Sequence, residues 1–392
     1  MIKELVFLLI NLFPNLNKVF VLSPICNTGA FLALLRAGLW EHDIKFSEYK
    51  GVDYNELYSL AKEQAVLGLI AAGLGHVCDV KVSRDIALTF IGNALQLEQR
   101  NTSMNRFVAE LIDQLRKFGV YTLLVKGQGV AQCYERPLWR SAGDIDLLLS
   151  AENYSKAKSF FDKVADYSKE GSVKEQDSLH LEYGVRGWTV ELHGTLHTNL
   201  SKRIDVGLDS IQEEIFKNRD VRTWENNKVV VFLPDPNSDV VFVFCHILQH
   251  FFQGGIGLRQ VCDWCRLIWT YRDAIEKDLL LNRLKEMGLV SEWKVFSAVA
   301  VEILHMPMDS MPLYEKGYNN KAKKVFSYIL EVGNFGHNKD RGYTNQYHGV
   351  VRKIITFGHQ AKDSLKLSCI FPIDAPRFLI RYLFEGSKQF VR

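Results

Sequence analysis

Two aspartates in a short apolar run are the first residues of this chain that suggest chemistry. Asp144 and Asp146 alternate with Ile145 and Leu147. In a strand this spacing turns both carboxylates to one face and both aliphatic side chains to the core. Neighbouring carboxylates repel each other, and a divalent cation such as Mg²⁺, which prefers oxygen ligands, removes that penalty. The motif alone also fits two solvent-facing aspartates on an edge strand, so the flanking residues must decide.

The residues before the aspartates predict a strand, a glycine turn and a helix. Tyr121–Val125 is largely apolar, Lys126–Gly129 contains two glycines, and Val130–Tyr134 fits a short helix. Gly127 would let the backbone approach a phosphate closely, with N–H groups of the helix start facing it. Lys126 could neutralise a phosphate oxygen, and its alternative role is that of a solvated turn lysine.

Further polar side chains complete the candidate site. Arg140 precedes the aspartates and could clamp a phosphate or steady a carboxylate, with a surface position as the alternative. Glu191 lies between Val190 and Leu192 in a segment typical of a strand, and it is the candidate for a third acid. His193 shares the face of Glu191 if the strand continues, so it either contacts a substrate or caps the strand.

Several features of this segment resemble a bacterial family of uncharacterised nucleotidyltransferases, in the superfamily of the DNA polymerase beta type. They are the strand, the Lys-Gly turn, the arginine, the Asp-Ile-Asp-Leu-Leu run and the later Glu-Leu-His. The resemblance implies an α+β fold: a small mixed β-sheet core flanked by N-terminal helices and a C-terminal helical bundle. It implies catalytic and metal-binding roles for Asp144, Asp146 and Glu191, and nucleotide-binding roles for Lys126, Gly127, Gln128 and Arg140. The expected cofactor is Mg²⁺, as two ions, with Mn²⁺ as a substitute.

The reaction implied by this resemblance moves a nucleoside monophosphate from a nucleoside triphosphate to an acceptor hydroxyl and releases pyrophosphate. A small molecule or a protein is the expected acceptor, because no basic, aromatic-interleaved stretch favours long nucleic acid. The alternative is a non-catalytic protein of the same fold that binds a nucleotide or a partner. Gln128 favours it, since this residue stands where the superfamily turn has its second small residue.

A third hypothesis is a zinc-stabilised scaffold. His246 and His250 are four residues apart, and Cys262 and Cys265 are three apart, which are spacings that could form a tetrahedral site. The cysteines lie within an apolar helical pattern, however, and cysteine is among the most buried residue types. The spacing therefore carries less weight than the acidic motif.

Three polar residues beyond the predicted core flank a glycine-rich loop at 254–257. We predict that His250, Arg259 and Asp263 form a buried polar network. Such a network would dock the helical bundle on the sheet or reach the acceptor, and docking is the favoured role.

Composition limits the class of protein. The 392 residues are 47% hydrophobic and 24% charged, an ordinary globular balance. A net charge of +3 does not by itself favour nucleic acid or a membrane surface. Seven scattered cysteines form no disulfide framework, so a cytoplasmic location is expected. Met1–Phe13 predicts an amphipathic helix rather than a signal or membrane segment, because a span takes about 20 apolar residues.

The periodicity predicts three regions: 1–115, helical; 116–236, the α/β core; and 237–392, helical again. We expect the first region to flank the sheet and wall one side of a cleft. Its predicted helices are Phe31–Leu39, Tyr54–Leu74 and Ile86–Leu115. In the core we predict a helix at Ala151–Val164 with Ser150 as its N-cap, and strands at His180–Val185, Trp188–His193 and Lys228–Leu233. In the last region we predict helices at Val240–Phe252, Leu258–Tyr271, Asp278–Leu289 and Val290–Met306, a mobile loop at Gly333–Gly349 and a helical tail from Pro376.

Overall fold

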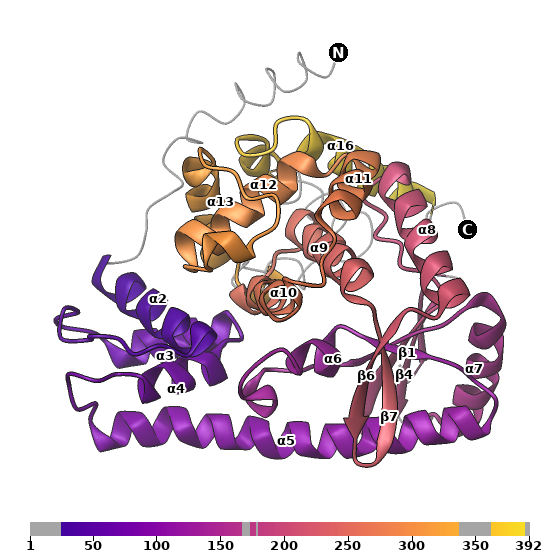
Figure 1. Cartoon of the computed structure of the whole chain (residues 1–392), viewed down its shortest axis with the longest axis horizontal. Coiled ribbons are helices and arrows are strands. Elements are labelled where there is room, and N and C mark those ends of the chain that lie inside the picture. The colour runs from indigo at the N-terminus through magenta and orange to yellow at the C-terminus, as the bar shows by residue number, and fades with distance from the viewer. Residues whose placement is uncertain (1–24, 167–172, 178, 337–361, 389–392) are drawn as a thin grey trace, which may run out of the picture.

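The computed structural model describes residues 25–166, 173–177, 179–336 and 362–388. Within these residues the protein is α+β, with helices from both ends of the chain packed around a small mixed sheet (Figure 1). The predicted helix at Met1–Phe13 and most of the predicted loop at Gly333–Gly349 lie outside the described residues. In the described ranges, no helix is both long enough and apolar enough to cross a membrane.

The N-terminal helices pack together beside the sheet, and the longest of them also runs beneath it (Figure 1). They are α2 (Ile25–Trp40), α3 (Tyr54–Glu63), α4 (Leu67–Gly75) and α5 (Arg84–Lys117). The single helix predicted over 54–74 is therefore wrong. The chain turns at Ala65, whose φ of 55° does not fit an α-helix.

The central sheet has five strands in the order β1-β2-β5-β4-β3. The strands are β1 (Leu123–Val125), β2 (Ile145–Leu148), β3 (Val173–Asp177), β4 (His180–Val185) and β5 (Trp188–His193). Only β2 and β5 pair in parallel; the other neighbours are antiparallel. The predictions for β4 and β5 are confirmed to the residue, whereas β3, a polar run, was not predicted.

The two faces of the sheet have different partners. Ile145 and Leu147 join a hydrophobic cluster with side chains of α5 and of α7 (Ala151–Val164), so these helices cover one face. Helix α7 has the predicted bounds and N-cap, because the hydroxyl of Ser150 accepts from the N–H of Asn153 at 3.4 Å. The opposite face carries the polar side chains of β2 and β5 and faces the C-terminal helices.

A helix and a hairpin connect the sheet to the C-terminal region. Helix α8 (Lys202–Asn218) is followed by β6 (Val221–Asn226) and β7 (Val229–Pro234), which pair antiparallel. The strand predicted at Lys228–Leu233 corresponds to β7. Helix α8 was not predicted, although its buried residues recur at helical spacing: Ile204, Leu208, Ile211 and Ile215.

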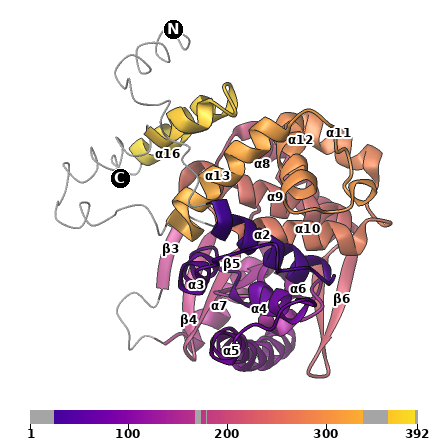
Figure 2. The same cartoon turned by 90° about the vertical axis from the view of Figure 1, so that its left-hand side faces the viewer.

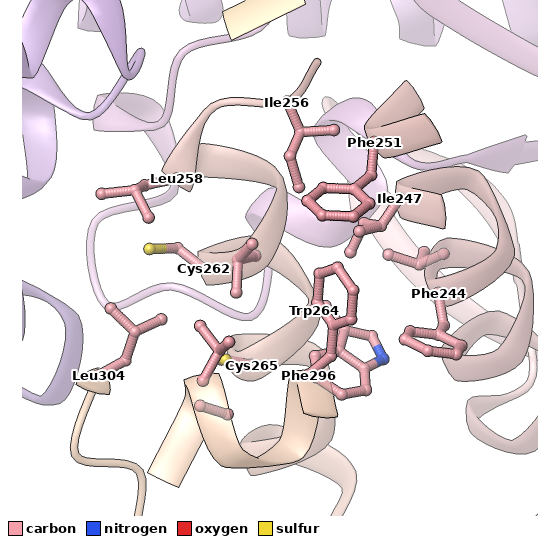
Figure 3. Packing of buried hydrophobic residues seen from close by; sticks show 14 of the residues in the cluster. Phe244, Ile247, Phe251, Ile256, Leu258, Cys262, Trp264, Cys265, Phe296 and Leu304 are labelled. Atoms are coloured by element: carbon pink, nitrogen blue, oxygen red, sulfur yellow. The ribbon is translucent and has the colours of Figure 1, made fainter. Parts of the chain in front are cut away.

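The C-terminal helices form an apolar bundle above the sheet (Figures 1 and 2). They are α9 (Pro236–Gln253), α10 (Leu258–Tyr271), α11 (Lys277–Met287), α12 (Val290–Ala298), α13 (Asn319–Val332) and α16 (Asp374–Lys388). Aromatic rings hold the bundle together: Phe244 lies 5.2 Å from Trp264 and 5.8 Å from Phe296 between ring centroids (Figure 3). The helix predicted to reach Met306 ends earlier, because α12 passes into a π-helical turn at Val299–Ile303.

Candidate functional site

The register between β2 and β5 brings the acidic residues together. The two strands run parallel, and Asp146 is the backbone partner of Glu191 while Leu148 is the partner of His193. Residues opposite each other on neighbouring strands point to the same face. As a result, ligand atoms of Asp146, Glu191 and His193 all lie within 4.8 Å of one another.

Lys126 directs its ammonium group into this cluster. It precedes α6 (Gly127–Ala131) and has φ 54° and ψ −144°, a conformation that strains any residue with a side chain. Its Nζ lies 2.6 Å from Oδ1 of Asp146, and Nε2 of His193 lies 2.8 Å from the same oxygen. His193 also lies 3.4 Å from Oε2 of Glu191. One carboxylate oxygen therefore has two cationic or polar partners.

The surroundings of the two aspartates shift their pKa values in opposite directions. The negative charge of Asp146, together with burial, raises the pKa of Asp144 to about 6. Burial alone would raise the pKa of Asp146, but Lys126 and His193 outweigh it and lower that pKa. Burial likewise opposes the charge of Lys126, yet the surrounding carboxylates raise its pKa. The site thus holds close negative charges that its own cations only partly neutralise.

These side chains open into a cavity of about 270 Å³ between the sheet and two C-terminal helices. From the sheet side it is lined by Lys126, Gly127, Asp144, Asp146, Glu191 and His193. From α9 and α10 it is lined by Phe242, Val243, His246, Ile247, Gln249, His250, Arg259, Gln260 and Asp263. The expectation that the N-terminal helices wall the cleft is wrong, since no described residue of α2 to α5 lines the cavity.

The α9 wall combines apolar side chains with uncharged polar ones. Phe242, His246 and His250 recur at helical spacing, and the two imidazole rings lie 4.4 Å apart. Burial, with the nearby charge of Lys126, lowers the pKa of His246 and lowers that of His250 to about 4. Both histidines are therefore neutral near pH 7. The Lys126 ammonium lies 6.0 Å from the Phe242 ring centroid, a distance at the limit of a cation–π contact.

Arg140 contacts an aspartate, but one contributed by α10. Its Nε and Nη2 donate to the carboxylate of Asp263 at 2.9 and 2.7 Å, and the pair is buried. The hydroxyl of Tyr134 donates to the same carboxylate at 2.8 Å. Arg140 lines the cavity, but its two hydrogen bonds connect the loop before Asp144 to α10. This agrees with the predicted docking role of Asp263.

Gln128 needs a correction. Its side chain is buried between α6 and α5, where Nε2 donates to Oδ1 of Asn101 at 3.0 Å, and it does not line the cavity. A binding role for this side chain is therefore not supported. Lys126 and Gly127, the other residues of the turn predicted to bind nucleotide, do line the cavity.

The burial of Cys262 and Cys265 argues against the zinc hypothesis. Cys262 and Cys265 lie in an apolar cluster with side chains such as Leu258 and Leu304 (Figure 3). Burial raises both thiol pKa values, which disfavours the thiolate that a zinc ion needs. The group of side chains in the described ranges that could hold a metal is instead Asp146, Glu191 and His193.

Sequence reasoning underrated two contributions to this site. The sequence predicts either substrate contact or strand capping for His193, although its period-two spacing from Glu191 places both side chains on one face. The four-residue spacing of His246 and His250 suggests a zinc site with the cysteines, whereas the structure places both histidines at the cavity. His246, Gln249 and His250 interrupt the apolar pattern of α9, and all three line the cavity, so they were the available signal.

Comparison with known proteins places the chain in a family. A family model described as "uncharacterised nucleotidyltransferase" matches residues 50–304, which include every residue of the acidic cluster and the cavity wall from α9 and α10. No curated protein and no solved structure gives a significant match.

Proposed function

The chain belongs to the uncharacterised nucleotidyltransferase family, and from that premise we propose that it moves a nucleoside monophosphate from a nucleoside triphosphate to an acceptor hydroxyl. Pyrophosphate is the second product. Family membership supports nucleotidyl transfer in general. The triphosphate donor, the hydroxyl acceptor and a two-metal mechanism are our proposal.

The observation that carries this proposal is the pairing of Asp146 with Glu191 across β2 and β5. It sets two carboxylates side by side, with Asp144 next to them and Lys126 within 2.6 Å of Asp146. All four residues line one cavity. Phosphoryl transfer depends mainly on positioning and on charge neutralisation, and this arrangement provides groups for both.

The side chains present suit divalent cations. The raised pKa of Asp144 reflects crowded negative charge that a cation would relieve. The carboxylates of Asp144, Asp146 and Glu191 suit Mg²⁺ and also Mn²⁺. When bound, two such ions would neutralise phosphate charge and stabilise the attacking and leaving oxygens.

The chain's own residues have distinct tasks in this proposal. Lys126 neutralises a phosphate oxygen, and Gly127 leaves room for the phosphate to approach the backbone. A carboxylate oxygen of Glu191 takes the proton of the acceptor hydroxyl. His193 donates to Asp146 and fixes the orientation of that carboxylate, as polar neighbours of metal ligands commonly do.

The wall opposite the acids bears on the acceptor. Phe242, Ile247 and the neutral His246 and His250 suit an uncharged hydroxyl compound or a protein side chain better than a polyanion. The net charge of +3 adds nothing in favour of long nucleic acid. The described cysteines are free, which favours a reducing compartment such as the cytoplasm.

The test incubates the purified protein with each common nucleoside triphosphate and Mg²⁺ or Mn²⁺, and measures pyrophosphate release. Mass spectrometry then searches for a nucleotidyl adduct on the protein and on a panel of small hydroxylated compounds. We expect metal-dependent release and one adduct. Metal-dependent triphosphate binding with no release across the panel would favour the non-catalytic alternative, and absence of binding would contradict both.

A further inference from the structure

Arg259 is a cation of the cavity wall that the acidic motif does not account for. It is the second residue of α10, and its side chain is 15% exposed. Its backbone N–H donates to the carbonyl of Gln64 at 3.3 Å, and the Gln64 side chain accepts from the N–H of Leu258 at 3.0 Å. The N-terminal region therefore fixes the start of α10, and with it the position of Arg259.

The charge of Arg259 is poorly compensated by the protein. Arg140 already makes two short hydrogen bonds to the only carboxylate nearby on α10, that of Asp263. Arg259 reaches the same carboxylate at 3.9 Å through Nη1, which also lies 3.4 Å from the carbonyl of Ser141. Burial and the charge of Arg140 lower the pKa of Arg259. Two guanidinium groups thus share the carboxylate of Asp263, and Asp144 adds a smaller electrostatic attraction to each of them.

Two nitrogens of this pair have no partner in the part of the chain that the structure describes. They are Nε of Arg259 and Nη1 of Arg140, and both are buried. A buried charged donor without an acceptor is costly, so an anion that supplies acceptor oxygens at this place would be bound favourably. Both residues line the cavity that holds the acidic cluster.

The chemistry of the missing anion follows from the charges around it. Three cationic and four anionic side chains line the cavity, a net charge of −1 if the histidines are counted as neutral. Two divalent cations at the acids would turn this into an excess of positive charge. A guanidinium recognises phosphate through paired hydrogen bonds, and a polyphosphate supplies both the charge and the oxygens.

We infer that Arg259 binds the phosphates of the triphosphate that depart as pyrophosphate, so that the C-terminal helical region contributes a binding residue to the active site. This inference rests on the proposed function. Arg140 is a positioning residue in this arrangement: its bond to Asp263 holds α10 where Arg259 reaches the cavity. Arg259 would thus set a requirement for a triphosphate over a monophosphate.

The experiment measures binding of inorganic tripolyphosphate by calorimetry, with Mg²⁺ and without any nucleoside or acceptor. The variants are Arg259→Met, which removes the charge, and Arg259→Lys, which keeps it. Arg266→Lys is the matched control, because Arg266 is a buried arginine on the same helix that donates to the carbonyls of Cys133 and Leu39 outside the cavity. Circular dichroism establishes that each variant is folded.

For Arg259→Met we expect a loss of roughly ten- to a hundredfold in tripolyphosphate affinity, the value of one buried charge-assisted contact. Arg259→Lys should recover part of it, Arg266→Lys should bind like the wild type, and phosphate alone should bind weakly throughout. Wild-type affinity in a folded Arg259→Met variant would overturn the inference even if nucleotidyl transfer occurs. If tripolyphosphate binding depends on Arg259 but no nucleotidyl transfer is found, the anion site is supported and the proposed reaction is contradicted.

Discussion

The two walls of the cavity are built in different ways. On the sheet wall, charged groups contact one another directly: Lys126 and His193 both lie within hydrogen-bonding distance of Oδ1 of Asp146. On the wall made by α9 and α10, the histidines are neutral, Asp263 is bound by Arg140 from the loop before Asp144, and Arg259 reaches Asp263 only at 3.9 Å. The sheet wall thus concentrates charge, whereas the helical wall is mostly uncharged and is fixed by a few side-chain contacts between distant parts of the chain.

This difference shows which forces maintain each wall. The acids of the sheet wall are aligned by backbone hydrogen bonds between β2 and β5, which do not depend on the side chains themselves. The helical wall depends on side-chain contacts between residues far apart in the chain, since Arg140 and Asp263 are separated by 123 positions. Substitutions in the sheet wall should therefore affect activity, and substitutions in the helical anchor should affect stability.

The largest expected effect comes from the aspartates of the sheet wall. Asp144→Asn or Asp146→Asn should each reduce pyrophosphate release on the order of 10²–10⁴-fold, as other electrostatic catalytic groups do. Because the strand pairing is maintained by the backbone, the fold should persist, as judged by circular dichroism. Asp113→Asn, an exposed aspartate of α5 paired with Lys117, is the control and should change nothing. A folded Asp146→Asn variant with wild-type rates would remove the basis of the site.

The anchor of the helical wall gives the next effect. Asp263→Asn leaves Arg140 as a buried cation without its anion, and breaking such a pair costs about 3–5 kcal/mol of unfolding free energy. Urea unfolding measures this loss. The control is Asp273→Asn, because Asp273 is exposed and its pair with Arg272 is long at 3.7 Å; it should change stability by about 0.5 kcal/mol or less. Equal effects of the two substitutions would show that the anchor is not needed.

Glu292 is a buried acid outside the cavity, away from the cations that lower the pKa of Asp146. Burial, and then the carboxyl group of Asp374, raise the pKa of Glu292 from 4.5 to about 8. The folded protein therefore binds this proton more tightly than the unfolded chain. Its contribution is fully present below pH 4.5 and is lost as pH rises through about 8.

We expect the unfolding free energy to fall by roughly 3 kcal/mol over this window, since each pKa unit corresponds to about 1.4 kcal/mol and part of the shift is shared with the neighbour. Urea unfolding across the pH range measures it. Glu292→Gln should flatten this pH dependence, because the amide stays neutral at every pH. A pH dependence that is unchanged in Glu292→Gln would assign the effect to another group.

The smallest effect is expected inside the helical bundle. Cys265→Ala should cost about 1 kcal/mol, the usual penalty for a small loss of buried volume, with no change on adding a chelator. Thermal unfolding with and without the chelator measures both. Chelator-sensitive unfolding of the wild type, together with zinc near one equivalent, would restore the zinc hypothesis.

The sheet wall could be predicted because its signals are local. Two strand-like runs joined through Arg186-Gly187 predicted β4 and β5 to the residue, and Asp-Ile-Asp with the later Glu191 predicted which acids meet. The predicted fold class is confirmed as well. By contrast, β3 and β6 are polar runs without such alternation, and they depend on their neighbours for stability.

The helical wall could not be predicted to the same depth. Arg259 and Asp263 were suspected of a polar network, but which arginine pairs with Asp263 is decided by tertiary packing. Likewise, α9 is apolar on nearly all sides, and the sequence alone does not show that the face with His246 and His250 borders a cavity rather than the core. Gln128 illustrates the opposite error: its place in the turn indicated a ligand, whereas its side chain packs against α5.

The central claim is that Asp144, Asp146 and Glu191 hold divalent cations for a triphosphate in the cavity between the sheet and α10. The most direct test is a crystal structure with Mn²⁺ and a non-hydrolysable nucleoside triphosphate, in which anomalous scattering locates the metal. We predict metal peaks at these carboxylates, with the outer phosphates directed to Lys126 and Arg259. A triphosphate bound elsewhere, or Mn²⁺ away from all three acids, would contradict the account.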